Sequence, residues 1–586
     1  MEVERSILGR AWRLRPCDEG VALAISQRHG LPEIVGRVLA GRGIGPGEAE
    51  AFLSPRLRDW LPDPSHLHDL DRAAARLAQA VVAGEPVGLV GDYDVDGATA
   101  TALVARYLRE LGVEVAFEIP DRMRDGYGPN PRLLGALAAR GCRLVVTLDT
   151  GTTAFEPLAW AAGQGLEVVV IDHHAAEERL PPALAVVNPN RVDQASPLKH
   201  LAAVGVAFVV LVAVARELRA KGFFKDRPEP ALLQRLDLVA LGTVCDVVPL
   251  TGLNRAFVHQ GLKVAQGAGL PGLAALARAA GLAAVSSARQ LGFVLGPRIN
   301  AGGRIGRSDL GARLLTSAGA AEAEALAGEL DALNAERQAI ERALLDKAEL
   351  AVEPQLAAGL PVLLAAGAGW HPGIVGIVAS RLVERHHRPA VVLGLADGVA
   401  KGSARSIRGF DLGAAVIAAR QQGLLRQGGG HGMAAGMTLA EEELDRFHRF
   451  LLDRFTDEAG AGVPAPEPLE LDGALSVAAA QPTLAARIGL MAPYGPGNAE
   501  PRFCLDGARA VEARVVGDGH VSCVLAGAMG GGRVKGIAFR CAGSPLGRAL
   551  LERGDLPLRL AGRVKLETWQ GREQASFEIE DGVRVS

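Results

Sequence analysis

Four short apolar runs between residues 86 and 172 most constrain the fold of this chain. The runs are VGLVG, VEVAFEI, RLVVTLD and EVVVID; they are rich in β-branched residues and carry little charge until their ends. Helical stretches such as TALVARYLREL and PRLLGALAAR separate them. This alternation predicts an α/β fold with a parallel, doubly wound sheet that helices cover on both faces.

Acidic and imidazole side chains gather where these predicted strands end. They are Asp92, Asp94, Asp96, Asp149, Asp172, His173 and His174. Because ligands of an open parallel sheet bind at the carboxyl ends of its strands, we expect these groups to face one crevice. Asp246, in GTVCDVVPL, is a further candidate because its neighbours are apolar and an unpaired buried carboxylate is costly.

Like charges this close together repel and raise one another's pKa, so a bound cation is expected. Carboxylates grouped with a histidine suit Mg²⁺ or Mn²⁺. This many carboxylates are more than one ion needs, and a bridging carboxylate holds two ions about 3.5–4 Å apart in phosphodiester-cleaving sites. Asp149 stands between the other groups in chain order and is the predicted bridge.

Two simpler interpretations of single residues are considered. An aspartate at a strand end usually caps the next helix. D-x-D-x-D-G also imitates a calcium loop, but no glutamate stands six residues after Gly97. Three successive strand ends that carry acids, the third followed by two histidines, favour a metal site over coincidence.

Length and composition set broader limits. A chain of 586 residues is too long for one core, so several domains are expected. The net charge of -3 gives no global sign of nucleic-acid binding. Six cysteines without a C-x-x-C pair argue against a disulfide framework and a zinc ribbon. The first residues lack a signal-peptide apolar core, and no apolar run reaches the roughly 18 residues that span a bilayer. We expect a cytoplasmic protein that does not enter membranes.

Changes in pattern divide the chain into five regions. They are an N-terminal helical region (1–80), an α/β unit (81–320), one long amphipathic connector helix (321–352), a second α/β unit (353–462) and an all-β module (466–586) that resembles a small barrel. Residues 502–586 hold 13 Lys and Arg against 10 Asp and Glu. Trp569, at a turn of this module, is a candidate for base stacking, with packing of a hairpin as the equal alternative.

Two glycine-containing cationic segments, KGSARS and GPRINAGGRIG, are interpreted as loops that cradle phosphate through backbone N–H groups and cationic side chains. The alternative for any one arginine is a solvated surface position. The candidate substrate-binding residues are Arg122, Arg298, Asn300, Arg304, Lys401, Ser403, Arg405, Ser406 and His431.

The ordered motifs GDYDVDG, TLDTG, IDHH and CDVVPL resemble the DHH phosphoesterase superfamily, and within it the single-strand exonucleases. RMRDGYG, VGVAF, WHPGIVGIVASRL and GGGHGMAAG extend the resemblance over about residues 85–440. It implies a DHH catalytic domain, a DHH-associated domain after the connector helix, and a terminal OB-like barrel.

The same resemblance implies a metal-dependent nuclease that degrades single-stranded DNA from its 5′ end in repair and recombination. The implied ligands of two Mn²⁺ or Mg²⁺ ions are Asp92, Asp94, Asp149, His173 and Asp246. Asp149 and His174 are the implied catalytic residues, and His174 would face the scissile phosphate. Some members have a histidine where this chain has Val90, so weaker affinity is expected for one ion.

The resemblance also implies a single-strand-binding protein and a helicase as partners, and we expect a monomer. Two other functions stay open at this point. One is a DHH hydrolase of oligonucleotides or cyclic dinucleotides, although such an enzyme needs neither the N-terminal region nor the β module. The other is a non-catalytic nucleic-acid scaffold, against which the intact ligand set argues.

Overall fold

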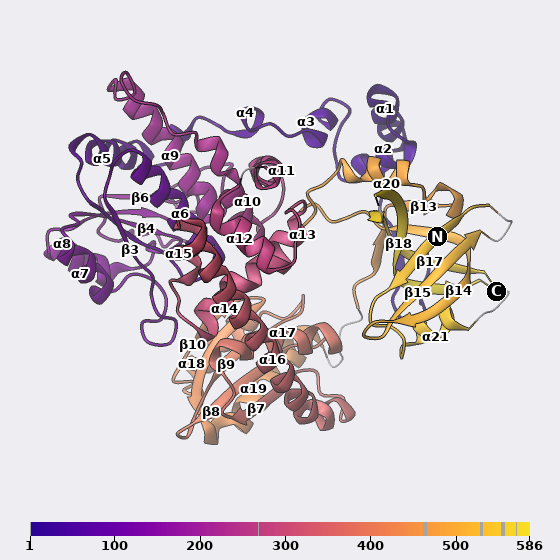
Figure 1. Cartoon of the computed structure of the whole chain (residues 1–586). Helices are drawn as coiled ribbons and strands as arrows, with labels where there is room; N and C mark the ends of the chain where they lie inside the picture. Colours follow the sequence, from indigo (N-terminus) through magenta and orange to yellow (C-terminus); the bar gives the residue numbers. More distant parts are fainter. Residues whose placement is uncertain are drawn as a thin grey trace.

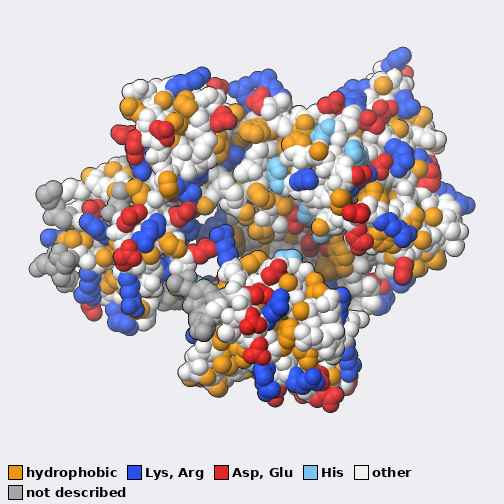
Figure 2. Space-filling model, turned by 180° about the vertical axis from the view of Figure 1, so that it is seen from behind, with side chains coloured by type: hydrophobic (Ala, Val, Ile, Leu, Met, Phe, Trp, Pro, Cys, Tyr) orange, Lys and Arg blue, Asp and Glu red, His pale blue; other side chains and the backbone are white. Residues whose placement is uncertain are grey.

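The computed structural model describes residues 2–267, 269–460, 466–527, 531–552, 557–569 and 571–585. Three lobes surround a central opening (Figure 1): the first α/β unit, the second α/β unit below it, and a β-barrel to one side. Figure 2 shows the opening from behind as a hollow with both Lys or Arg and Asp or Glu side chains at its border. No helix among the described residues is long and apolar enough to cross a lipid bilayer.

The first lobe contains the predicted parallel sheet. Its order is β3-β2-β4-β5-β6, and every neighbouring pair is parallel. The strands are β2 (Val87–Val90), β3 (Val115–Glu118), β4 (Leu144–Leu148), β5 (Glu167–Ile171) and β6 (Ala185–Val187). The covering helices are α5 (Leu70–Ala83), α6 (Val95–Glu110), α7 (Pro131–Ala139), α8 (Phe155–Gly163) and α9 (Ala203–Ala220). Because both faces of the sheet pack against apolar clusters, the strands are mainly apolar, with Glu118 and Glu167 at strand ends, as predicted.

Helices complete this lobe and lead to the second. They are η2 (Leu232–Arg235), α10 (Leu236–Cys245), α11 (Gly252–Gln266), α12 (Pro271–Ala279), α13 (Ala288–Gln290), the π-helical turn η3 (Leu291–Leu295), α14 (Gly296–Ile305) and α15 (Leu310–Thr316). The interpretation of GPRINAGGRIG as a loop was wrong, because α14 runs through it. Its proline stands in the first turn, where its missing N–H costs nothing.

The long helix α16 (Ala320–Ala357) joins the two α/β lobes and extends beyond the predicted residues 321–352 at both ends. The second sheet has the order β10-β11-β9-β8-β7. Its strands are β7 (Leu363–Ala368), β8 (Ala390–Ala396), β9 (Val399–Arg405), β10 (Gln427–His431) and β11 (Ala434–Ala440). Its helices are α17 (Pro372–His386), α18 (Leu412–Gln421), η4 (Glu441–Glu443) and α19 (Leu444–Ala459). KGSARS is therefore mostly strand β9 and not a loop, because β8 and β11 pair with it on both sides.

The barrel closes because β14 pairs with both β15 and β17, as an OB-like fold requires. Its strands are β13 (Gly473–Leu475), β14 (Phe503–Val516), β15 (His520–Gly527), β16 (Arg533–Ala538), β17 (Leu558–Trp569) and β18 (Arg572–Arg584). The accompanying helices are η5 (Val477–Ala479), α20 (Pro482–Gly489) and α21 (Pro545–Leu551). Phe503, Leu525 and Phe577 are buried inside it.

The N-terminal region is not only helical, and it does not form one unit. Its elements are β1 (Trp12–Leu14), α1 (Glu19–His29), α2 (Glu33–Ala40), α3 (Ala49–Leu53), α4 (Leu57–Trp60) and η1 (Pro64–His66). Strand β1 pairs in parallel with β12 (Leu469–Leu471) beside the barrel. Ile25 of α1 and Val35 of α2 share an apolar cluster with the barrel interior. Figure 1 accordingly shows α1 and α2 next to α20, far from α5 of the first lobe.

One buried arginine ties the barrel arm to the first lobe. Arg255 of α11 donates hydrogen bonds to the carbonyls of Phe52 (3.0 Å), Ala492 (2.9 Å) and Pro493 (3.2 Å). Its guanidinium also lies 4.0 Å from the centre of the Phe52 ring. Burial lowers the pKa of Arg255 to about 10, but three carbonyls and an aromatic face compensate the charge.

Candidate metal centre and phosphate pocket

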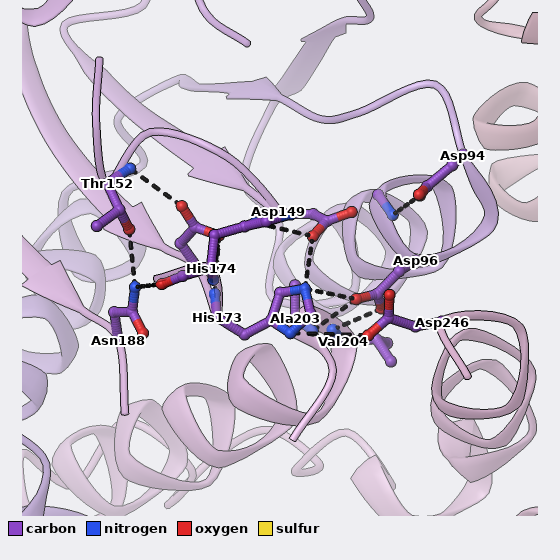
Figure 3. A network of polar contacts seen from close by, with 12 residues as sticks. Asp94, Asp96, Asp149, Thr152, His173, His174, Asn188, Ala203, Val204 and Asp246 are labelled. Carbon is purple, nitrogen blue, oxygen red and sulfur yellow. Dashed lines mark hydrogen bonds and ion pairs between the residues drawn. The ribbon is translucent and has the colours of Figure 1, made fainter. Parts of the chain in front are cut away.

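The acidic side chains meet at the carboxyl edge of the first sheet, as the sequence predicts. His173, directly after β5, lies at their centre (Figure 3). Its Nε2 lies 3.3 Å from Asp149 Oδ1 and 3.9 Å from Asp96 Oδ2, and its Nδ1 lies 3.7 Å from Asp246 Oδ2. Asp246 follows the last turn of α10, so a helix end and three strand ends supply one cluster.

Three overlapping groups could each hold a cation. They are Asp149–His173–His174, Asp96–His173–Asp246 and Asp92–Asp94–Asp149, with the ligand atoms of each group within 4.8 Å of one another. Asp149 belongs to the first and third groups. An oxygen shared between two such groups is what a bridging carboxylate needs.

Several carboxylate oxygens in this cluster are buried without a hydrogen bond. Asp92 Oδ1, Asp149 Oδ1 and Asp246 Oδ2 have no hydrogen-bond partner within the described part of the chain. Burial, followed by the neighbouring carboxylates, raises the pKa of Asp92 to about 8 and that of Asp246 to about 8, and raises the pKa of Asp149 well above its ordinary value. Such oxygens are costly unless a cation faces them, so the residues present fit a hard divalent ion.

Asp172 orients the two histidines. Its carboxylate accepts hydrogen bonds from the backbone N–H groups of Thr152 (3.0 Å) and His173 (2.7 Å), and its Oδ1 lies 2.8 Å from His174 Nδ1. Burial acts to raise the pKa of Asp172, but the His174 and Thr152 hydrogen bonds lower it overall. Burial acts to lower the pKa of His174, but Asp172 and the other carboxylates raise it to about 9. His174 is therefore a cation held beside the acid cluster.

Asp94 and Asp96 also cap helices. The interpretation of a strand-end aspartate as a helix cap therefore applies to them in part. Asp94 accepts from Gly97 N (3.0 Å) at the start of α6. Asp96 accepts from Ala203 N (2.6 Å) and Val204 N (3.0 Å) at the start of α9. Asp96 is absent from the implied ligand set, although it is the third aspartate of the GDYDVDG motif. A Cβ at Gly97 would lie 2.5 Å from the Asp92 backbone nitrogen, which explains the glycine that ends this motif.

Asp149 has a strained backbone. Its φ of 62° lies in the left-handed region, which non-glycine residues rarely adopt and which concentrates at functional sites. Its N–H donates to Ile171 O (3.0 Å), and its carbonyl accepts from the Tyr127 hydroxyl (2.8 Å). That hydroxyl also lies 3.3 Å from His174 Nδ1. Tyr127 was not among the predicted site residues, although it belongs to the RMRDGYG motif.

Val90 does not face this cluster. It is fully buried and packs in the apolar cluster with Leu133 and Leu137. The expected weaker affinity for one ion stays a prediction.

A second site opens between the two α/β lobes. It is a cavity of about 340 Å³ lined by Arg122 and Arg304 from the first lobe, Ser403 and Arg405 from β9, and one side of α17. The α17 side includes Arg381, which pairs with Glu384 (2.7 Å). Burial, followed by the neighbouring arginines, lowers the pKa of Arg304 to about 10 and also lowers that of Arg405. Three crowded cations beside a helix N-terminus form a site for an anion. We call this cavity the arginine pocket.

The other predicted substrate-binding residues lie elsewhere. Ser406 is buried, and its hydroxyl donates to Phe410 O (2.9 Å), so the strand alternation that brings Ser403 and Arg405 into the pocket turns Ser406 away. Arg298 pairs with Asp331 of α16 (2.8 Å). Asn300 is half-buried on α14, and Lys401 and His431 are exposed on the second sheet. The side chain of Trp569 lies outside the described residues.

Comparison with known proteins agrees with this geometry. The profile of the DHH family N-terminal domain matches residues 86–243, that of the DHHA1 domain 359–457, and that of the RecJ OB domain 471–581. The chain is 40% identical over 528 residues to the single-stranded-DNA-specific exonuclease RecJ of Dickeya dadantii, covering 87% of this chain and 89% of that protein. The Escherichia coli RecJ is 37% identical over 87% of this chain and 89% of its own length.

The chain belongs to the RecJ family. A crystal structure of RecJ from Thermus thermophilus in complex with Mn²⁺ superimposes with a TM-score of 0.79 at 32% identity, covering 98% of this chain and 80% of that one. A second structure of that protein is a complex with Mg²⁺. Family membership confirms the predicted fold class, exonuclease activity and cofactor, Mn²⁺ or Mg²⁺.

Proposed function

We propose that this chain is a metal-dependent exonuclease that removes nucleotides from the 5′ end of single-stranded DNA during repair and recombination. One observation carries the proposal: an acid cluster fit for divalent ions lies near the arginine pocket, since Arg122 of the pocket lies 5.1 Å from the ring centre of Tyr93, the residue between Asp92 and Asp94 of the cluster. The acid cluster would serve phosphodiester hydrolysis. The arginine pocket would bind a strand terminus, because a terminal phosphate carries more negative charge than an internal one.

Asp92, Asp94, Asp149, His173 and Asp246 would hold two Mn²⁺ or Mg²⁺ ions. Bound there, the ions would lower the pKa of water and stabilise charge that develops on the phosphate. The chain contributes a rigid frame: Asp94 and Asp96 fix their positions by capping helices, and Asp172 fixes the histidines. Asp149 is the proposed bridge.

His174 is proposed to act on the phosphate itself. Its side chain is 49% exposed, whereas that of His173 is 14% exposed. With a pKa of about 9, His174 is protonated at neutral pH, so it would contact an anionic phosphate oxygen and could supply a proton.

The arginine pocket would set the polarity. Arg122, Arg304, Ser403 and Arg405 would bind the 5′ phosphate, since they come from both lobes and face one cavity. Phe293, 80% exposed on the π-helical turn beside this pocket, is placed to stack on a base near the 5′ end.

The barrel would bind the strand farther from the cut, as OB folds do. Single-strand-binding protein and a helicase are partners within this proposal, which places the enzyme in the cytoplasm with its DNA substrate. A hydrolase of short oligonucleotides alone would make no use of the barrel.

A nuclease assay tests the proposal. With Mn²⁺, a long 5′-phosphorylated strand should be degraded from its 5′ end, and a blunt duplex and a 5′-hydroxyl strand should be poorer substrates. Preference for dinucleotides or cyclic dinucleotides would favour the rival hydrolase. Binding of DNA without any metal-dependent cleavage would favour a scaffold.

A further inference from the structure

A second arginine-lined cavity lies outside the proposed catalytic machinery. It has a volume of about 560 Å³ and follows strand β3, the outer strand of the first sheet. It shares no lining residue with the arginine pocket. Arg124 and Arg307 line this cavity, whereas Arg122 and Arg304 line the arginine pocket. We call it the β3 groove.

The floor of the β3 groove is an open strand edge. The carbonyls of Glu114 and Glu118 accept hydrogen bonds from Val87 and Gly91 beside β2, so the even-numbered residues of β3 face the sheet. The odd-numbered residues, Val115 and Phe117, therefore direct their N–H and C=O groups into the groove. The Val115 carbonyl is occupied by Arg109 Nη2 (3.1 Å). The N–H and C=O of Phe117 have no partner among the described residues.

The walls carry a surplus of positive charge. The arginines that line the groove are Arg109, Arg124, Arg132, Arg140, Arg307 and Arg313. Arg140 pairs with Glu118 (2.8 Å), Arg307 with Asp309 (2.7 Å), and Arg124 and Arg132 share Asp125.

Two of these arginines are left without a close acid. Arg313 is 4.0 Å from Asp309, which already holds Arg307, and the side-chain contact of Arg109 is the Val115 carbonyl. They line the groove from α15 and from α6. A polyanion would compensate this charge.

We propose that the β3 groove binds a nucleoside polyphosphate. The base would pair with the Phe117 N–H and C=O, and the phosphates would lie among the arginines, chiefly Arg109 and Arg313. One free donor–acceptor pair matches the edge of a single nucleobase. An acidic peptide that extends the sheet would need a longer run of free backbone groups than this four-residue strand offers. The volume lies within the range of small-ligand sites, about 300–1,000 Å³.

Calorimetric titration of the metal-free full chain with ATP tests the site, with EDTA present to keep the acid cluster out of the measurement. ATP should bind equally to the wild type and to two variants that leave the β3 groove intact, Arg278→Gln and Arg405→Ala. Arg278 is the matched control, because it pairs with Glu324 (2.7 Å) outside the groove. Arg109→Gln and Arg313→Gln should bind about tenfold more weakly or worse, with melting temperatures recorded for each. Equal affinity in all five proteins, or loss only in Arg405→Ala, would overturn the proposal.

Two measurements on the wild type guard against variants that fail to fold. Hydrogen exchange should show ATP protecting the Phe117 amide, and inorganic tripolyphosphate should bind more weakly than ATP because it lacks a base. No protection at Phe117, equal affinity for tripolyphosphate, or tighter binding of a polyglutamate peptide would each exclude a nucleotide as the occupant.

Discussion

His174 Nδ1 lies 2.8 Å from Asp172 Oδ1, and the same oxygen also accepts the backbone N–H groups of His173 (2.7 Å) and His174 (3.2 Å). The first residue of the D-H-H motif is thus fully used in orienting the second and third. Its oxygens bind protein N–H groups, whereas oxygens of Asp92, Asp149 and Asp246 remain free for metal.

Asp172→Asn should lower kcat by about 10²-fold while leaving metal affinity within a few-fold. The carboxylate raises the pKa of His174 to about 9, so without it His174 should lose its proton at lower pH. The alkaline limb of the kcat–pH profile should therefore move to lower pH. Asp193→Asn, which removes a surface partner of Arg191, is the control. An unmoved alkaline limb would contradict the role of His174.

Asp149→Asn should abolish hydrolysis, with kcat reduced at least about 10²-fold, yet leave the metal-free protein no less stable. The substitution replaces a buried carboxyl group whose Oδ1 has no hydrogen-bond partner among the described residues, and burying such a group costs free energy when no cation is bound. Melting temperatures with and without Mn²⁺ check this. A metal-free variant that melts well below wild type would show that Asp149 supports the fold instead.

Stabilisation by Mg²⁺ should increase with pH. Burial and neighbouring carboxylates raise the pKa values of Asp92 and Asp246 to about 8, so the metal-free folded state holds protons that the unfolded state has already lost. These raised pKa values favour the metal-free fold at low pH, and that contribution is lost as pH rises from about 4 through about 8. Mg²⁺ must also displace these protons. The shift in melting temperature should be larger at about pH 8.5 than at about pH 6; the opposite order would contradict the assignment of these ligands.

Arg405→Ala should raise KM for a 5′-phosphorylated strand about tenfold or more and change KM for a 5′-hydroxyl strand much less. No ion pair of Arg405 occurs among the described residues, and its guanidinium donates to the Ala404 carbonyl (2.9 Å). The melting temperature should therefore not fall. Arg408→Ala removes an exposed arginine from the same lobe and serves as control. A lower melting temperature with unchanged KM would refute phosphate binding by Arg405.

Removing the residues after 465 should weaken DNA binding more than it slows cleavage at saturating DNA, because the barrel carries basic charge and none of the proposed ligands. The structure adds that Ile25 and Val35 would lose their apolar partners. A truncated protein should therefore aggregate unless residues 1–53 are removed as well. Affinity at several salt concentrations, measured on the doubly truncated protein, checks the prediction. Full affinity at low salt would exclude the barrel as a DNA-binding element.

The metal site could be predicted because its determinants are local. An apolar run followed by an acid places that acid at a strand end, and parallel strands then bring the acids together. KGSARS was misinterpreted because glycine and serine are typical of loops, whereas pairing with β8 and β11 decides its state. Strand β1 was missed because its partner, β12, lies far along the chain and three residues carry little pattern. Asp96 was left out of the implied ligand set, and its contact with the start of α9 depends on tertiary structure that the sequence does not show.

The junction of β1 with the barrel bears on how the protein is synthesised. Trp12 Nε1 donates to Asp581 Oδ2 (3.0 Å), a partner 569 residues farther along the chain. During translation the first helices therefore leave the ribosome long before their apolar partners exist, while both α/β lobes can complete their sheets. A nascent chain would expose Ile25 and Val35 throughout this interval, which makes the early segment a target for holding chaperones. Ribosome-bound chains that end near residue 460 should be cleaved by protease within residues 1–53 and be resistant over the first sheet.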